Sequence, residues 1–395
     1  MKKHELQTPA ILLDLDKLEH NIQSWQALCN ENGKELWPMI KTHKSTALAK
    51  MQLDAGATGF LCGTLDECEM VYQLGAKHIM YAYPTANPVN IRRLLPFAKD
   101  AELIIRLDTV RAAEILNSEA EKAGVTVSYT VIVDMDFHRF GMPADAVVDF
   151  VKTLSSLKNL KFRGISTHPG QVYGCTTRAA LEAVAKLEKD TMKKAADALA
   201  AAGFPCEIIS SGSTPTFEIA VKDKTLNVSH PGNYTFFDNI QISLGTCGED
   251  ACSLRVLATV VSHPSEGFYL FDAGSKCLGL DQGAHGNSAI KGFGHVVGHP
   301  ELTIVGLSEE VAKVKADGTC TLQVGDRVEI IPNHSCSTAN NTGWYTCVRG
   351  DEIVDFIAAE SLCSGLHTRL SLFRSPSEVH SALPCSAAIS PPAAL

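Results

Sequence analysis

The 395-residue sequence lacks several features that would place it in particular classes of protein. It contains no run of 18 apolar residues, so no segment is expected to span a membrane. The start, MKKHELQTPAILLDLD, has no apolar segment of the kind found in secretory signals. Aromatic residues are sparse at 7%, basic residues form no block, and the formal net charge is −9. This composition argues against nucleic acid as a partner.

The cysteines also lack the arrangement of a disulfide framework. There are 13 of them, an odd number with irregular spacing and no Cys-x-x-Cys pair. Several lie in apolar stretches, such as Cys62 in GFLCGT and Cys206 in FPCEII. We therefore expect buried, reduced thiols and a cytoplasmic location.

Residues 10–245 alternate between short apolar segments and longer amphipathic ones. Strand and helix patterns recur about every 25 to 30 residues, which favours parallel strands joined by helices. About eight such units predict an α/β fold with a closed (β/α)8 barrel over residues 10–245. The segments predicted as strands are AILLDL, ELWPMI, TGFLCG, HIMYAY, AELIIRL, SYTVIVD, FRGIST, CEIISS and TLNVS.

After residue 245 the pattern changes to short segments of β type separated by Gly, Pro and Asp. These segments predict an antiparallel β-domain over residues 246–362, to which we assign residues 1–9 as well. Residues 363–395 are rich in Ser, Ala and Pro without any period. We expect this tail to be poorly ordered.

Two lysines, Lys41 and Lys44, follow the apolar segment ELWPMI. If that segment is a strand, Met39 and Lys41 project from one face and Ile40 from the other. A partly desolvated lysine at the carboxyl end of a barrel strand is a usable amine nucleophile. An ordinary solvated lysine is the commoner outcome, and we expect Lys44, at a helix start, to be exposed.

Small residues follow a predicted strand at positions 210–214, in IISSGSTPTFE. Late in a (β/α)8 barrel, such a loop before a helix is a common site for phosphate, because backbone N–H groups converge there. The later segment HPGNYTFFD adds a second glycine turn at Gly232, with a phenol at Tyr234. The alternative is two ordinary loops.

The segment IIPNHSCSTAN places His334 and Cys336 two residues apart, so they would share a face of an extended chain. An imidazole and a thiolate suit zinc better than magnesium or calcium. Two ligands leave positions for water and substrate, which is typical of a catalytic rather than a structural site. The alternative is a half-buried cysteine beside a loop histidine.

Polar residues follow two further predicted strands. In VIVDMDFHRFGM, Arg139 offers fixed donors to an oxygen anion, and STHPGQVYG supplies His168 and Tyr173. Both segments lie where the chemistry of a barrel is found. They would be equally compatible with ordinary polar loops.

These motifs occur together in the order of a known family. The chain resembles the pyridoxal-phosphate (PLP) enzymes of the alanine racemase fold, and most closely their D-serine dehydratase and D-threonine aldolase branch. The resemblance covers about residues 7–360, nearly the whole chain before the tail. It rests on the segments TPAILLDLDKLEHNI, MIKTHKS, VDMDFHRFGM, GSTPT, HPGNYTFFD, FDAGSK and PNHSC.

The resemblance implies a role for each site. Lys41 would form the Schiff base with PLP, Arg139 would lie near the phenolic oxygen of the ring, and Tyr173 near its pyridine nitrogen. His334 and Cys336 would bind a divalent metal, with zinc favoured by the thiolate. The family also implies a homodimer with the active site near the subunit interface. The residues implied to hold the phosphate are Ser211, Gly212, Ser213, Thr214, Gly232, Asn233 and Tyr234.

The resemblance further implies a lyase that converts D-serine, or a related β-hydroxy D-amino acid, to a 2-oxo acid and ammonia. His-x-Cys at the metal position is typical of the dehydratases, whereas His-x-Asp is typical of the aldolases, which release glycine and an aldehyde. The segment HSC therefore favours the dehydratase, although DFHRFG is closer to the racemase wording. A racemase, which needs no metal pair, and a non-catalytic PLP-binding barrel, which lacks a C-terminal β-domain, are the remaining alternatives.

Overall fold

The structure, a computed structural model, describes residues 1–282 and 290–361. The predicted tail at 363–395 lies outside the described residues. Among the described residues, no helix is both long and apolar enough to cross a membrane.

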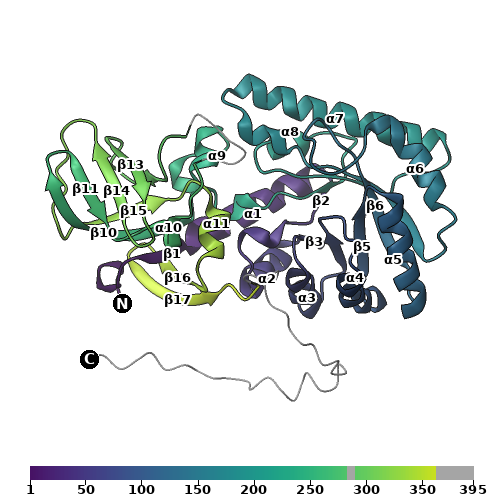
Figure 1. The fold of residues 1–395 in the computed structure, drawn as a ribbon, viewed down its shortest axis with the longest axis horizontal. Helices are drawn as coiled ribbons and strands as arrows, with labels where there is room; N and C mark the ends of the chain where they lie inside the picture. Colours follow the sequence, from purple (N-terminus) through teal and green to yellow (C-terminus); the bar gives the residue numbers. More distant parts are fainter. Residues whose placement is uncertain (283–289, 362–395) are drawn as a thin grey trace, which may run out of the picture. The chain divides into compact units, whose positions relative to one another are not determined.

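Eight parallel strands form a barrel in the order β2-β9-β8-β7-β6-β5-β4-β3 (Figure 1). A parallel bridge between Met39 and Leu61 links the two ends of this order, so the barrel is nearly closed. This confirms the predicted (β/α)8 architecture. The strands are β2 (Glu35–Leu36), β3 (Gly59–Cys62), β4 (His78–Tyr81), β5 (Glu102–Leu107), β6 (Val127–Ile132), β7 (Leu160–Ser166), β8 (Ile208–Ser211) and β9 (Val228–Ser229).

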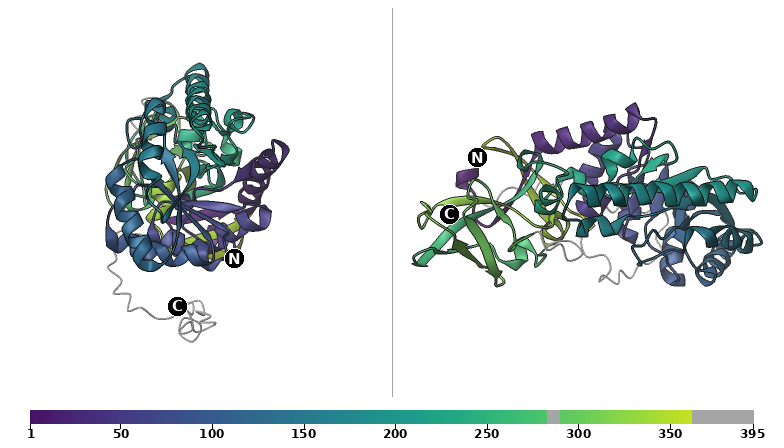
Figure 2. Two further views of the ribbon diagram at one scale, coloured as in Figure 1. Left: turned by 90° about the vertical axis from the view of Figure 1, so that its right-hand side faces the viewer. Right: turned by 90° about the horizontal axis from the view of Figure 1, so that it is seen from above.

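Helices lie outside the barrel strands, as the left view of Figure 2 shows. Burial on both faces accounts for continuous apolar strands such as β3, in which every residue is buried. The hydroxyls of Thr64, Thr109 and Thr177 accept N–H bonds at the starts of three helices and so fix where those helices begin. The helices after the strands are α2 (Thr46–Ala55), α3 (Leu65–Gln73), α4 (Pro88–Leu94), α5 (Val110–Ala123), α6 (Val147–Leu154), α7 (Arg178–Ala201) and α8 (Phe217–Ala220).

A second sheet of nine strands forms the β-domain, with the main order β13-β14-β11-β10-β1-β16-β17. Its pairs are antiparallel except that β1 runs parallel to β16. Strand β14 has little apolar signal in its sequence, because four of the five residues of AKVKA are lysine or alanine. The strands are β1 (Ala10–Asp14), β10 (Leu254–Ser265), β11 (Phe268–Phe271), β12 (His295–Val296), β13 (Leu302–Leu307), β14 (Ala312–Ala316), β15 (Arg327–Ile331), β16 (Trp344–Arg349) and β17 (Glu352–Ala358).

The prediction that AILLDL forms the first barrel strand is wrong. This segment forms β1, which lies between β10 and β16 at the centre of the second sheet. Ile11, Leu12 and Leu13 are all buried there. A strand buried on both faces has the same apolar sequence in either sheet, so periodicity cannot say to which one it belongs.

The helix after β1, α1 (Leu15–Glu31), connects the two sheets through an aromatic stack. Trp25 stacks on Phe217 of α8 at 4.1 Å and on Tyr234 at 4.9 Å between ring centroids. These rings belong to one buried apolar cluster that also contains β1 and much of the β-domain sheet. The loops after β8 and β9 are therefore packed against a rigid core, which holds them in place for the site below. The remaining helices are α9 (Asn239–Ser243), α10 (Ser275–Leu278) and α11 (Ser335–Asn340).

Candidate active site

A cavity of about 290 Å³ lies at the carboxyl ends of the barrel strands and brings together most of the predicted site residues. Its size is near that of small-molecule sites in general. Of the residues predicted for the site, Ser211 and Tyr234 are absent from its lining. The lining residues are Met39, Lys41, Thr42, Leu61, Ala82, Tyr83, Arg106, Arg139, Thr167, His168, Tyr173, Gly212, Ser213, Thr214, His230, Gly232, Asn233, Asp281, His334 and Cys336.

Lys41 lies in a short 3₁₀ helix, Ile40–Thr42, rather than at the end of a strand. Strand β2 ends at Leu36, although the Met39 N–H still donates to the Pro231 carbonyl at 3.0 Å. The alternation of faces predicted for Met39 and Lys41 therefore does not apply, yet Lys41 does line the cavity. The turn is fastened to the β-domain, because the Tyr345 hydroxyl donates to the His43 carbonyl at 2.7 Å.

Lys44 is buried, contrary to the expectation that it is exposed. Its Nζ lies 2.6 Å from the Glu67 carboxylate, whose other oxygen accepts the Gly63 N–H at 2.6 Å. The backbone of Lys44 has φ +52°, and this left-handed conformation turns the side chain inward. Among the described residues, no carboxylate lies within ion-pair distance of Lys41. The two lysines thus have different surroundings: Lys44 forms an ion pair with Glu67, whereas Lys41 lines the cavity.

Two glycine turns after β8 and β9 form one wall of the cavity. A Cβ on Gly212 would lie 2.4 Å from the His230 carbonyl oxygen, and a Cβ on Gly232 would lie 2.7 Å from that of Met39. Only glycine permits this approach. The Thr214 hydroxyl is buried without a hydrogen-bond partner among the described residues. A buried hydroxyl needs a partner, so this wall fits the phosphate of a bound cofactor.

The side chains of Ser211 and Tyr234 do not take the roles predicted for them. The Ser211 hydroxyl donates to the buried Glu188 carboxylate. Tyr234 is fully buried, and its hydroxyl accepts a hydrogen bond from Gln52 at 2.9 Å. Both residues lie next to the glycine turns without lining the cavity, a difference that sequence spacing cannot reveal.

Glu188 predicts a pH dependence of stability. Burial raises its pKa from 4.5 to about 7, so the folded chain holds a proton that the unfolded chain has lost between these values. Stability should therefore fall as pH rises from about 4.5 to 7. Glu188→Gln should abolish this fall. The free energy of unfolding of the variant, relative to that of the wild type, should therefore rise by about 2 to 3 kcal/mol between pH 5 and pH 8. Urea titrations of both apoproteins at the two pH values would measure it. An equal difference at pH 5 and pH 8 would contradict the assignment.

Two cationic side chains, those of Arg139 and Arg106, also line the cavity. The Arg139 guanidinium lies 4.8 Å from the ring centroid of Phe137 and 5.9 Å from that of Tyr83. Arg106, which the sequence analysis missed, is buried on β5 and donates to Ser166 at 2.8 Å and to the Ala82 carbonyl. Burial lowers its pKa only to about 10, so it stays charged at neutral pH. A lone arginine in the apolar segment AELIIRL was the signal that could have revealed it.

Two histidines in the cavity are neutral acceptors. His168 Nδ1 lies 2.6 Å from the Gly212 carbonyl oxygen, and His230 Nδ1 lies 2.9 Å from that of Trp37. Because a carbonyl only accepts, each Nδ1 carries the proton and each Nε2 is left as an acceptor. Burial lowers the pKa of His168 well below its usual value and that of His230 to about 3.

Tyr173 contacts the glycine turn after β8 through its hydroxyl. The hydroxyl is hydrogen-bonded to the Thr214 backbone and to the Gln241 side chain. Desolvation of the hydroxyl raises the pKa of this phenol well above its usual value, so it stays protonated. Tyr173 can therefore both accept and donate hydrogen bonds in the cavity.

His334 and Cys336 both line the cavity, but not as neighbours on an extended strand. His334 precedes α11 as its N-cap residue, and Cys336 lies in the first turn of the helix. The Cys336 thiol lies 3.4 Å from the Thr42 hydroxyl, next to Lys41. Burial opposes ionisation of both side chains, yet their mutual attraction prevails: it raises the pKa of His334 to about 9 and lowers that of Cys336. A metal ion would displace the proton of His334, and an imidazole beside a thiolate is a donor set suited to zinc.

Asp238, also missed by the sequence analysis, lies behind this pair. Its fully buried carboxylate accepts hydrogen bonds from Asn233 at 2.7 Å and from the Ser335 N–H at 3.0 Å. The same oxygen lies 3.8 Å from His334 Nδ1. This distance is too long for a hydrogen bond, and the buried His334 Nδ1 has no hydrogen-bond partner among the described residues. Asp238 thus links the second glycine turn to the His334 segment.

Comparison with known proteins covers both parts of the chain. The family model described as alanine racemase, N-terminal domain, matches residues 13–239, and that described as putative serine dehydratase domain matches residues 253–348. A D-threo-3-hydroxyaspartate dehydratase of Delftia sp. (strain HT23) is 32% identical, over 88% of this chain and 95% of that protein. Its solved structure superposes with a TM-score of 0.84 at 31% identity and covers 91% of this chain and 98% of that one.

Two further relatives carry different activities. A 3-hydroxy-D-aspartate aldolase of Paracoccus denitrificans (strain Pd 1222) is 28% identical, over 89% of this chain and 91% of its own length. A D-serine dehydratase of Dictyostelium discoideum is 29% identical, over 88% of this chain and 95% of its own length. All three relatives are thus similar to this chain over nearly their whole lengths.

Proposed function

The chain belongs to the PLP-dependent lyases of the alanine racemase fold, in the branch of D-serine dehydratases and D-threonine aldolases, and from this premise we propose that it is a dehydratase. It converts a β-hydroxy D-amino acid, either D-serine or D-threo-3-hydroxyaspartate, to a 2-oxo acid and ammonia. The observation that carries this choice is the His334–Cys336 pair beside Lys41 in the cavity.

The cavity walls suit PLP, which when bound supplies an electron sink for the bonds at Cα of an amino acid. Lys41 would hold it through its amine, and the turns at Gly212 and Gly232 with the free Thr214 hydroxyl would hold its phosphate. Arg139 and Tyr173 are the proposed partners of the ring. The neutral His168 adds no charge beside these groups, and its Nε2 can accept a proton from a donor in the cavity.

The metal pair would act on the β-hydroxyl of the substrate, for which a divalent ion supplies a Lewis acid. We propose zinc, because a thiolate ligand selects against magnesium. Two solved structures of D-threo-3-hydroxyaspartate dehydratase support the position of this site. They are alanine mutants of a histidine and of a cysteine two positions apart, and the second is described as metal-free. In this chain the Asp238 carboxylate, 3.8 Å from His334 Nδ1, would attract that side chain electrostatically.

A D-threonine-type aldolase is the second candidate, favoured by the aldolase among the relatives. The test is to incubate the purified protein with D-serine, D-threo-3-hydroxyaspartate and D-threonine, with the L-enantiomers as controls. A dehydratase releases 2-oxo acid and ammonia in equal amounts. Glycine with an aldehyde would identify the aldolase instead, and absence of any product from all three D-amino acids would overturn both.

Removal of the metal is expected to stop turnover without releasing the cofactor. Chelation, or His334→Ala and Cys336→Ala separately, should lower turnover roughly 100-fold or more, since Lewis-acid assistance is worth several kcal/mol. The visible absorption of bound PLP should persist, and added Zn²⁺ should restore only the chelated wild type. Cys277→Ala is the matched control, because this half-buried thiol does not line the cavity. Full activity after chelation, with metal shown to be gone, would disprove the role of the pair.

We also propose a homodimer in a reducing, cytoplasmic environment. Arg139 and the neighbouring Phe140 are exposed in the single chain, although Arg139 lines the cavity, so a second subunit could cover this edge. The described cysteines are all free. Light scattering on the eluted holoenzyme would give its mass, and a monomer would contradict the dimer.

A further inference from the structure

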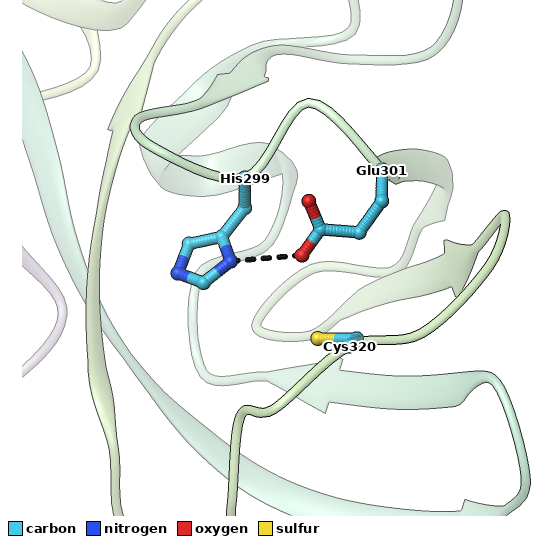
Figure 3. A group of neighbouring side chains, drawn as sticks. All are labelled: His299, Glu301 and Cys320. Carbon is cyan, nitrogen blue, oxygen red and sulfur yellow. Dashed lines mark hydrogen bonds and ion pairs between the residues drawn. The ribbon is translucent and has the colours of Figure 1, made fainter.

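Three side chains of types that can bind metals lie close together in the β-domain (Figure 3). None of them lines the cavity of the candidate active site. They are His299, Glu301 and Cys320, and one ligand atom from each lies within 4.8 Å of the others. His299 and Glu301 lie between β12 and β13, whereas Cys320 comes from the connection after β14. Two chain segments therefore contribute to one cluster that the proposed reaction does not use.

The backbone under the cluster is fixed by hydrogen bonds. The His299 N–H donates to the Val296 carbonyl at 3.1 Å, and the His299 carbonyl accepts the Leu302 N–H at 3.0 Å. The Asp317 N–H donates to the Glu301 carbonyl at 2.8 Å, which ties the connection after β14 to the start of β13. Groups held in this way need little rearrangement to bind an ion, which is a requirement of a preorganised site.

The donor set is that of zinc. An imidazole nitrogen, a carboxylate oxygen and a sulfur are the three ligand types that Zn²⁺ takes in proteins. Tetrahedral bonds of zinc length would place these atoms roughly 3.3 to 3.8 Å apart, and the three atoms are already within 4.8 Å of one another. The His299 and Glu301 side chains are 25% and 22% exposed, so an ion can reach them from solvent.

Two side chains of the cluster are already joined by a hydrogen bond. His299 Nδ1 lies 2.9 Å from the Glu301 carboxylate, and this hydrogen bond lowers the pKa of Glu301. The Cys320 Sγ lies within 4.8 Å of the ligand atoms of His299 and Glu301. An ion would replace the His299–Glu301 hydrogen bond, and the thiol would lose its proton to solvent.

We propose that His299, Glu301 and Cys320 form a second divalent-metal site, which binds Zn²⁺ with water as the fourth ligand. The ion would join the β12–β13 turn to the connection after β14 and so stabilise that edge of the β-domain. The site is independent of the proposed reaction, since it shares no ligand with the His334–Cys336 pair.

The test uses holoenzyme carrying His334→Ala and Cys336→Ala, so that the cavity contributes no thiolate. Stripped of metal and titrated with Co²⁺, this protein should bind one equivalent and develop thiolate–cobalt charge-transfer and long-wavelength d–d bands. Zn²⁺ should displace the bands and raise the melting temperature. Adding Cys320→Ala should remove the bands and the thermal shift. Adding Cys277→Ala instead, the matched control, should leave both.

Three results would overturn the proposal. One is the absence of cobalt bands in the double variant, and another is bands that persist after Cys320→Ala. The third is loss of the bands with Cys277→Ala but not with Cys320→Ala. None of them depends on turnover, so failure of this site and failure of the proposed reaction are distinguishable.

Discussion

Lys41→Ala should remove both the visible absorption of bound PLP and all measurable turnover. Lys41 lines the cavity with no carboxylate in ion-pair distance among the described residues, so its amine is available for covalent attachment. The measurement is an absorption spectrum of the purified variant after incubation with PLP, followed by the assay with D-amino acids. Lys41→Arg should fail equally, because a guanidinium keeps the charge but cannot lose its proton to become a nucleophile.

The neighbouring lysine provides the contrast. Lys44→Ala should retain the visible absorption, since the Nζ of Lys44 is held by Glu67 and does not line the cavity. If Lys41→Ala kept the absorption and Lys44→Ala lost it, the assignment of the two lysines would be reversed. If Lys41→Arg kept turnover, the role of Lys41 would be electrostatic rather than covalent.

Lys44→Ala should instead be the most destabilising of these substitutions. Its ion pair with Glu67 is almost wholly buried, with side-chain exposures of 11% and 0%. Removing the lysine leaves a buried carboxylate without its counter-ion, which costs about 3 to 5 kcal/mol. Urea titrations of the variant and the wild type would measure the loss. Lys50→Ala is the matched control, because its pair with Asp54 is exposed and is worth only about 0.3 to 0.5 kcal/mol.

Replacing Glu67 together with Lys44 gives a second test of this ion pair. The double variant Lys44→Met, Glu67→Leu should recover most of the stability, since an apolar pair avoids the desolvation of two charges. A single Lys44→Ala that costs no more than Lys50→Ala would mean that water reaches Glu67. A double variant no more stable than the single one would mean that packing, rather than charge, accounts for the loss.

Much of the barrel was predictable because the period of the apolar residues and the spacing of the apolar segments directly reflect which residues are buried. All nine segments predicted as strands are strands, and eight of them form the barrel. AILLDL was assigned to the wrong sheet, since a doubly buried strand reads the same in either one. The exposure of Lys44 was also wrong, because a left-handed turn and an acid 23 residues away decide it.

The site was predictable as a collection of residues but not as a geometry. His334 and Cys336 reach the cavity from a helix start, not from the extended segment that the spacing predicted, and their role as a metal pair stays a prediction. Ser211 and Tyr234 turn away from it, because their hydroxyls are held by Glu188 and Gln52, residues distant in sequence. The lone arginine of AELIIRL was a signal for Arg106, but its bond to Ser166, like the contact of Asp238 with Asn233, needed the structure.

The position of β1 has a consequence for the synthesis of the chain. This strand leaves the ribosome before its neighbours β10 and β16, which follow about 240 and 330 residues later. At typical translation rates the gap before β10 is roughly 10 to 50 seconds. During that time the barrel can fold, whereas the apolar edges of β1 have no partner. The nascent chain therefore carries an unpaired strand until β10 has been synthesised, and in that interval a chaperone would have most to protect.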